Sequence, residues 1–437
     1  MKKILIGAAL GCALILSANA CSNPGTSSSA PSATSTVNPT GSLKGVSLTF
    51  WTAQSSVGEP KQVIDAFEKA TGATVNTVVV PDPYESNLPT KLASGEKPDL
   101  AFWQPTQSTL PFINPAQNLL PLDGAPWVNL LGPTEQSLGQ IDGHRYAAIV
   151  TSPAMLGVYY NKADFARAGI TTMPKNYDEM LADARLIKQK DTGVAPFFEV
   201  GGDRWPLQWQ VQVQMTDLPA SFWTNLNANK DSWTNPVIVR AITKYQNQVL
   251  GAGLAQPDYK TATFADQGTA VMNGTAAMAV NVTALQAEIQ ATNTTAQMDR
   301  ALGWFPIANS SPQALYSPDQ TNGVVAFNTG NSANEAAARQ FIDFWLTTDY
   351  PSYIAAQKLV SAEPSVPNPP GLPQTATTQA AALDSATGVF QVKALTAPDM
   401  HLYLADMIYG AKSPLQVAQA CEDQFTQVLK ARGVAGF

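Results

Sequence analysis

The sequence predicts an α/β fold, because strand-like and helix-like segments alternate along it. VSLTF (46–50) and ATVNTVVV (73–80) are apolar-rich strands, and EPKQVIDAFEKATG (59–72), between them, has the spacing of a helix. This order predicts a mostly parallel sheet with helices on both faces. A length of 437 residues is enough for two to three lobes.

The first helix has clear start and stop signals. Pro60 suits its first turn and Gly72 ends it. A short helix is expected near 88–94, followed by the strand PDLAFW (98–103). These elements extend the alternating pattern through the first quarter of the chain.

The later elements continue the α/β pattern. Asn176 and Glu179 have the spacing of a capping box at the start of one helix, and Ser332 and Glu335 have the same spacing at the start of another. Further elements are expected as a helix over 235–250 and strands over 274–281, 301–308 and 323–328. The Pro-rich segment 361–375 is expected to be a surface connection, and two helices end the chain.

Charge excludes one class of function. The formal net charge is −7, only 14% of the residues are charged, and no basic block occurs. Nucleic acids are bound through clustered Lys and Arg, so a nucleic-acid partner is not expected.

The N-terminus predicts export. Met1-Lys2-Lys3 precedes an apolar run over 4–16, which is too short for a bilayer of ~30 Å at ~1.5 Å per residue. Small residues follow, so residues 1–20 are interpreted as a signal peptide. Its removal changes the formal charge from −7 to −9.

Cys21 follows the cleavage site and resembles the lipidated Cys of a bacterial lipobox, although Ala18 stands where Leu is usual. Residues 21–42 are rich in Ser, Thr, Pro and Gly and are interpreted as a flexible tether with a reach of ~25 Å, which suits a lipid-anchored protein. The alternative is cleavage after Ala20 by ordinary signal peptidase and release. Cys12 leaves with the signal, and Cys421 is interpreted as a core residue, so no disulfide is expected.

The ordered motifs resemble the extracellular solute-binding proteins that serve ABC importers, in particular the carbohydrate-binding group that includes maltodextrin-binding protein. The matching segments are VSLTFW (46–51), KLASGEKPDLAFW (91–103), YAAIVTSPAMLGVYYNKADFARAGI (146–170), MPKNYDEMLADARLIK (173–188), GTAAMAVN (274–281), GWFPIA (303–308) and GVVAFNTGNSANEAAARQFIDFWLT (323–347). They occur in the family's order over most of the mature chain.

The resemblance implies a two-lobe periplasmic-binding-protein-like fold with a hinge and an interlobe ligand cleft. Crossings between lobes are expected near Thr151, 306–312 and 360–364. The N-terminal lobe would comprise 43–151 and 308–360, and the C-terminal lobe 152–307 and 361–437. The implied function is capture of a neutral carbohydrate for an ABC permease by a monomer anchored through lipid to the outer face of the cytoplasmic membrane, without cofactor or metal.

Two tryptophans are the leading candidates for ligand contact. Trp51 directly follows the strand VSLTF, and Trp103 directly follows DLAF. Ligands of open α/β sheets bind beyond the carboxyl ends of the strands, so both rings are expected to be exposed at the cleft and to stack on a sugar. The tryptophan that matches Trp103 lines the sugar site of maltodextrin-binding protein, but the charged residues that follow it there are replaced by Thr106 and Gln107.

Polar residues at other strand ends and crossings complete the candidate site. The set comprises Thr52, Gln54, Gln104, Thr106, Thr151, Ser152, Asp203, Arg204, Trp205, Asn281, Trp304, Thr321 and Asn322. Trp304 could equally be a core residue. Trp127, Trp209, Trp223, Trp233 and Trp345 are interpreted as packing residues.

An enzyme is the competing class. A glycosidase would need two carboxylates across a cleft, and Asp99 and Glu199 have no evident pairing. His144 and His401 lack a nucleophile or metal-ligand pattern around them. Binding of amino acids, peptides, polyamines or metals by the same fold is the other alternative.

Overall fold

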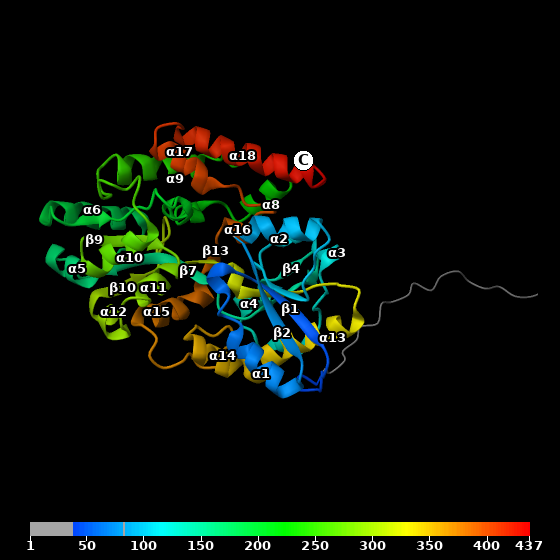
Figure 1. Cartoon of the computed structure of the whole chain (residues 1–437). Helices are drawn as coiled ribbons and strands as arrows, with labels where there is room; N and C mark the ends of the chain where they lie inside the picture. Colours follow the sequence, from blue (N-terminus) through cyan, green and yellow to red (C-terminus); the bar gives the residue numbers. More distant parts are fainter. Residues whose placement is uncertain (1–37, 82–83) are drawn as a thin grey trace, which may run out of the picture. The chain divides into compact units, whose positions relative to one another are not determined.

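A computed structural model describes residues 38–81 and 84–437 of the chain, and Figure 1 shows its elements. The predicted signal peptide, Cys12, Cys21 and nearly all of the tether lie outside the described residues and stay predictions. Within the described part, the strands form two large sheets and one short pair, β4 (Gln140–Ile141) with β5 (His144–Arg145).

The first sheet has the order β2-β1-β3-β12-β6. Its strands are β1 (Ser47–Ala53), β2 (Thr74–Val80), β3 (Leu100–Phe102), β6 (Ala147–Ile149) and β12 (Gly323–Ala326). The parallel prediction is confirmed for β2-β1-β3, but β12 runs antiparallel to both neighbours. The sheet is therefore mixed, because β12 enters it from the second sheet and not through a β-α crossover.

Helices cover both faces of the first sheet, as predicted. On one face lie α1 (Lys61–Thr71) and α13 (Ser332–Phe344), where Phe67 and Phe341 pack edge to face at 5.0 Å between ring centroids. The other face packs against α2 (Tyr84–Ala93). Gly72 ends α1 with φ at 76°, a conformation that favours glycine, which confirms the predicted stop.

The second sheet has the order β13-β11-β7-β9-β8, and β10 also pairs with β7. Its strands are β7 (Ala154–Asn161), β8 (Ala195–Phe197), β9 (Ala276–Asn281), β10 (Leu302–Phe305), β11 (Leu315–Ser317) and β13 (Thr387–Gly388). Most of its pairs are antiparallel, centred on β7.

The remaining helices of the described residues are listed here in chain order. They are α3 (Pro115–Asn118), α4 (Pro133–Ser137), α5 (Lys162–Ala168), α6 (Tyr177–Lys190), α7 (Trp209–Gln212), α8 (Phe222–Asn227), α9 (Pro236–Lys244), α10 (Phe264–Asn273), α11 (Ala284–Gln290), α12 (Thr295–Ala301), α14 (Tyr350–Gln357), α15 (Gln374–Ala382), α16 (Phe390–Lys393), α17 (Met400–Ile408) and α18 (Pro414–Ala431). Cys421 is buried on α18, which confirms the core assignment. Within residues 38–81 and 84–437, no helix combines the length and apolarity that a bilayer crossing needs.

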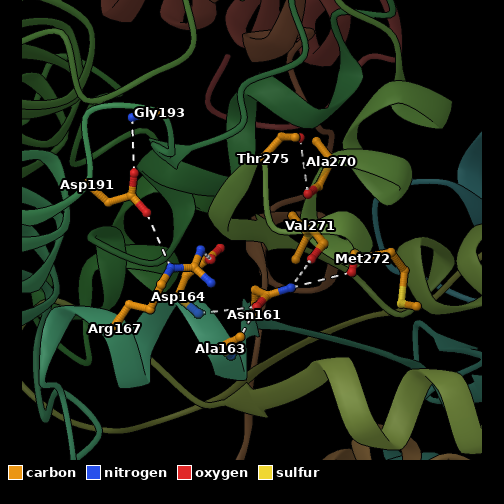
Figure 2. Close-up of polar contacts among 10 residues, drawn as sticks. All are labelled: Asn161, Ala163, Asp164, Arg167, Asp191, Gly193, Ala270, Val271, Met272 and Thr275. Carbon is orange, nitrogen blue, oxygen red and sulfur yellow. Dashed lines mark hydrogen bonds and ion pairs between the residues drawn. The ribbon is translucent and has the colours of Figure 1, made fainter.

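Asn161 shows how the YNK motif organises the second sheet. It ends β7, and its side-chain oxygen accepts a hydrogen bond from the backbone N–H of Ala163 (3.0 Å), which caps α5 (Figure 2). Its Nδ2 donates to the carbonyl of Val271 at 2.9 Å, which ties the strand end to α10. The Asn of this motif is therefore a structural residue here.

The two predicted capping boxes differ in outcome. Asn176 accepts from the backbone N–H of Glu179 at 2.9 Å, so the predicted start of α6 is confirmed. The cap of α13 was expected at Ser332 but is Asn331, whose side chain accepts from Ala333 and Asn334. The prediction was wrong by one residue because Asn is as good an N-cap as Ser.

The chain passes between the two sheets three times. The first passage is 150–153, between β6 and β7, and the second is 318–322, between β11 and β12. The second was expected at 306–312, but β11 intervenes and pairs with β7. The third lies between α14 and α15, over 358–373. The residue boundaries of the lobes themselves stay a prediction.

Candidate functional site: a cavity at the three passages

A cavity of about 760 Å³ lies where the three passages meet. Its wall includes residues 151–155, residues 357–360, and Asp319, Thr321 and Asn322. Parts of α11 and α15, which belong with the second sheet, form the opposite wall. This volume is in the range of small-molecule sites, which are commonly a few hundred to about 1,000 Å³.

Hydrogen bonds join the passages at this wall. Asn322, which is buried, donates from Nδ2 to Thr151 Oγ1 at 2.6 Å and to the carbonyl of Ser152 at 3.0 Å. The Ser152 hydroxyl lies 2.8 Å from the carbonyl of Ser361, in the third passage. The polar groups of the wall are thus held in fixed positions before a ligand arrives.

The opposite wall is organised in the same way. Thr283 Oγ1 accepts from the backbone N–H of Met155 at 2.7 Å and lies 3.2 Å from Gln379 Oε1. Gln286 Oε1 accepts from Thr375 Oγ1 at 2.6 Å. Alanine and leucine side chains also line the cavity. The lining thus includes both hydrogen-bonding groups and small apolar side chains.

Carboxylates outnumber cations at the cavity. Glu59, Glu288 and Asp319 line it, and Lys358 is the cation among the described lining residues. Burial, and then the charge of Asp319, raise the pKa of Glu59 to about 7. Asp319 has an exposed side chain and accepts from the backbone N–H of Thr321 at 3.2 Å. An anionic ligand would meet repulsion here.

The comparisons with known proteins identify the family. The family model of bacterial extracellular solute-binding proteins matches residues 54–350, which is more than half of the chain. The chain belongs to this family. A binding protein of Brucella abortus (strain 2308) is 25% identical over 339 residues, which cover 71% of this chain and 77% of the relative.

Solved structures show the fold of this solute-binding protein. A chitin oligosaccharide binding protein matches with a TM-score of 0.72 at 18% identity, over 87% of this chain and 98% of that one. The solute-binding protein RafE in complex with raffinose matches with a TM-score of 0.69 at 19% identity, over 87% and 99%. The two-lobe α/β fold expected from the sequence is confirmed. The family match makes this chain a solute-binding protein and not an enzyme.

The expected exposure of the two leading tryptophans was wrong. Trp51 is 6% exposed and Trp103 is 1% exposed, and both pack against α2. Strand β1 continues to Ala53, so Trp51 stands on a sheet face and not beyond the strand end. The segment after Trp103 folds back, and the indole Nε1 of Trp103 donates to the carbonyl of Thr109 at 3.1 Å. Neither ring lines the cavity.

The polar residues that follow these tryptophans also lie away from the cavity wall. Thr52 is fully buried, and its hydroxyl has no partner among the described residues. Gln54 is exposed. Gln104 donates to the carbonyl of Pro318, in the second passage, and Thr106 is buried in a hydroxyl cluster with Ser108.

The candidates of the second sheet are likewise distributed elsewhere. Asp203 and Arg204 are exposed, and the half-buried Trp205 stacks near Phe264 at 4.9 Å. Asn281 is buried and donates to Gln267 at 2.5 Å. Trp304 is 5% exposed and lies in the core. None of these side chains lines the cavity.

Ser152 and Asn322, together with Thr151 and Thr321, are the predicted residues that the structure brings to the cavity. Sequence reasoning missed Glu59, Asp319 and the side chains of α11 and α15. Thr283 could have been found, because it follows the strand GTAAMAVN by two residues. Helix α15 gave no signal, because the Pro-rich segment before it was interpreted as an isolated connection.

The described lining residues have aliphatic, polar or charged side chains. None of them carries an aromatic ring, and no cluster of three potential metal ligands occurs in residues 38–81 and 84–437. Glu199 is buried away from the cavity and accepts from Gln210 and Tyr245. Asp99 Oδ2 accepts from the backbone N–H of Thr49, on the neighbouring strand β1, at 2.7 Å. The tryptophans at 127, 209, 233 and 345 are buried, as the packing assignment requires.

Proposed function

We propose that this solute-binding protein captures a neutral carbohydrate in the cavity at the three passages. The observation that carries the proposal is the lining itself, which combines hydrogen-bonded hydroxyls and amides with small apolar side chains. A sugar ring has the same division, with hydroxyls at its edge and C–H groups on its faces. Relatives of the same fold bind chitin oligosaccharide and raffinose.

The charge of the cavity supports an uncharged ligand. Three carboxylates and one cation occur among the described lining residues, so an anion would be disfavoured. A neutral polyol can use the same carboxylates as hydrogen-bond acceptors. The proposed contacts are Ser152, Asn322, Thr283, Gln286 and Gln379, all of which line the cavity.

The proposal includes the transport role. The ligand would favour a closed arrangement of the lobes, which a membrane permease of an ABC importer would recognise. Lipidation of Cys21 would hold the monomer at the outer face of the cytoplasmic membrane. Mass measurement of the membrane-extracted N-terminus tests the anchor, because release after Ala20 would leave no lipid.

The proposed ligand class can be tested by thermal shift. The purified protein is heated with raffinose, a chitin oligosaccharide, single sugars, amino acids and polyamines. A true ligand at 100 times its Kd stabilises the folded state by about 2.7 kcal/mol. Stabilisation by a saccharide, lost in Asn322→Ala, is the expected result. Stabilisation by a non-sugar solute alone would overturn the carbohydrate proposal.

A further inference from the structure

A buried carboxylate lies directly behind one of the cavity hydroxyls. Glu135, on α4, is 3% exposed and does not line the cavity. The Ser152 hydroxyl, which does line it, donates to Glu135 Oε1 at 2.9 Å. The carboxylate therefore contacts the cavity only through Ser152.

The position of Glu135 is fixed by its own helix. The buried Arg145 guanidinium donates to the carbonyls of Gln136 (2.6 Å) and Leu138 (2.9 Å) at the end of α4. A Cβ atom at Gly132 would come within 2.6 Å of Glu135 Oε2, so the carboxylate lies close against this glycine. The fold thus holds this carboxylate against Ser152.

The hydrogen-bond geometry allows two arrangements. Ser152 has one hydroxyl hydrogen, and two acceptors are in reach: Glu135 Oε1 at 2.9 Å and the Ser361 carbonyl at 2.8 Å. An ionised Glu135 is the stronger acceptor and takes the hydrogen. A neutral Glu135 would instead donate to Ser152 Oγ, and Ser152 would donate to Ser361. In both arrangements the Ser152 hydrogen stays with a protein acceptor, so the charge of Glu135 decides whether both lone pairs of Ser152 Oγ remain free for a ligand O–H or only one.

We propose that Glu135 is a positioning residue for ligand binding: in its ionised form it takes the Ser152 hydrogen and leaves both lone pairs of Ser152 Oγ free to accept a ligand O–H at this point of the cavity. The inference rests on the proposed function and specifies one contact of the ligand. A chain from the ligand hydroxyl through Ser152 to a carboxylate is strengthened by mutual polarisation. A ligand with only an acceptor at this position would be rejected, because Ser152 has no hydrogen left to donate.

The arrangement links ligand affinity to pH. Burial raises the pKa of Glu135, which its own backbone N–H and Ser152 partly oppose, and Asp384 raises it further. The hydroxyls of Tyr316 and Tyr350 and the Arg145 guanidinium also lie near it. Because the ionised carboxylate accepts the Ser152 hydrogen, ligand affinity is retained above this raised pKa and weakens as pH falls through it.

The experiment compares the wild type with Glu135→Gln and Ser152→Ala by isothermal titration calorimetry. Raffinose and a chitin oligosaccharide are the probes, over about pH 4 to 8, which spans the ordinary Glu pKa and the raised range. We expect Glu135→Gln to weaken binding about tenfold at the upper pH, as for loss of a hydrogen bond to a charged group, and to lose the Glu135 part of the pH dependence. In the Ser152→Ala background, the same substitution should have no further effect.

A matched control separates this carboxyl group from its neighbours. Glu363, in the third passage, also has a pKa raised by burial, to about 7, and has no bond to Ser152. Glu363→Gln should leave affinity and its pH profile unchanged. Effects of Glu135→Gln and Ser152→Ala that simply add, or a Glu135→Gln variant that keeps the wild-type profile, would overturn the inference.

A ligand-free measurement distinguishes this inference from the proposed function. Infrared difference spectra, assigned with Glu135→Gln, follow the protonation of the Glu135 carboxyl group. Because Ser152 stabilises the ionised form, Ser152→Ala should move the titration to higher pH. An unmoved titration would show that the hydrogen lies elsewhere. If the titration moves but neither saccharide binds, the positioning contact stands and the carbohydrate proposal fails.

Discussion

The buried Glu199 predicts an unusual dependence of stability on pH. It is 5% exposed, accepts from Gln210 Nε2 (2.7 Å) and Tyr245 (2.9 Å), and burial raises its pKa from 4.5 to about 7. A carboxyl group with a raised folded pKa binds its proton more tightly in the folded state. Its stabilising contribution is therefore complete below the unfolded pKa and is lost as pH rises through about 7.

The magnitude follows from the shift. Each pH unit between 4.5 and about 7 is worth about 1.4 kcal/mol, so about 3 kcal/mol of unfolding free energy is lost over this interval. Glu199→Gln keeps the shape of the neutral acid without the titration. We expect the substitution to cost little at pH 5 and to stabilise the protein by up to about 3 kcal/mol at pH 8.

Urea denaturation of both proteins at the two pH values measures this difference. Glu96→Gln is the matched control. Lys91 lowers the pKa of this exposed carboxyl group, so above pH 5 it is ionised in both the folded and the unfolded state. The reasoning is refuted if Glu199→Gln has the same pH dependence as the wild type. It is also refuted if the variant is destabilised more at pH 8 than at pH 5.

Three further substitutions or probes test the packing and the passages. Gly157→Ala places a Cβ 2.3 Å from Trp304 Cζ2 and should lower the unfolding free energy by about 3 kcal/mol, measured in urea. Asn322→Ala leaves Thr151 Oγ1 and the Ser152 carbonyl without their donor and should lower the unfolding free energy by about 2 to 4 kcal/mol. An unchanged denaturation midpoint would show that these hydrogen bonds do not stabilise the joined passages. Burial raises the pKa of the Cys421 thiol, so a thiol reagent should modify it only at the rate of unfolding, and fast modification of the native protein would contradict its buried position.

Much of the fold could be predicted because local signals agree with the tertiary structure. Gly72 ends α1 with the left-handed conformation that its position implies, and Asn176 caps α6. The apolar stripe that contains Cys421 is the buried side of α18. In each case, the residues that decide the structure are neighbours along the chain, so periodicity and capping rules are sufficient.

The candidate site was harder to predict because it depends on where strands end and how loops return. Trp51 would have been exposed if β1 ended at Phe50, but pairing with β2 continues through Ala53. Trp103 is covered by the turn that brings Thr109 back over its ring. Pairing partners and loop paths are set by distant residues, which a local pattern does not contain.

The meeting of the three passages has a consequence for how occupancy is sensed. Residues 151–155, 357–360 and Asn322 are at once the chain's routes from one sheet to the other and the lining of the cavity. A solute held there touches the backbone segments whose torsion angles must change if the sheets are to reorient. Ligand binding would then restrict the torsion angles of the three passages directly, without a separate element to couple binding to lobe movement.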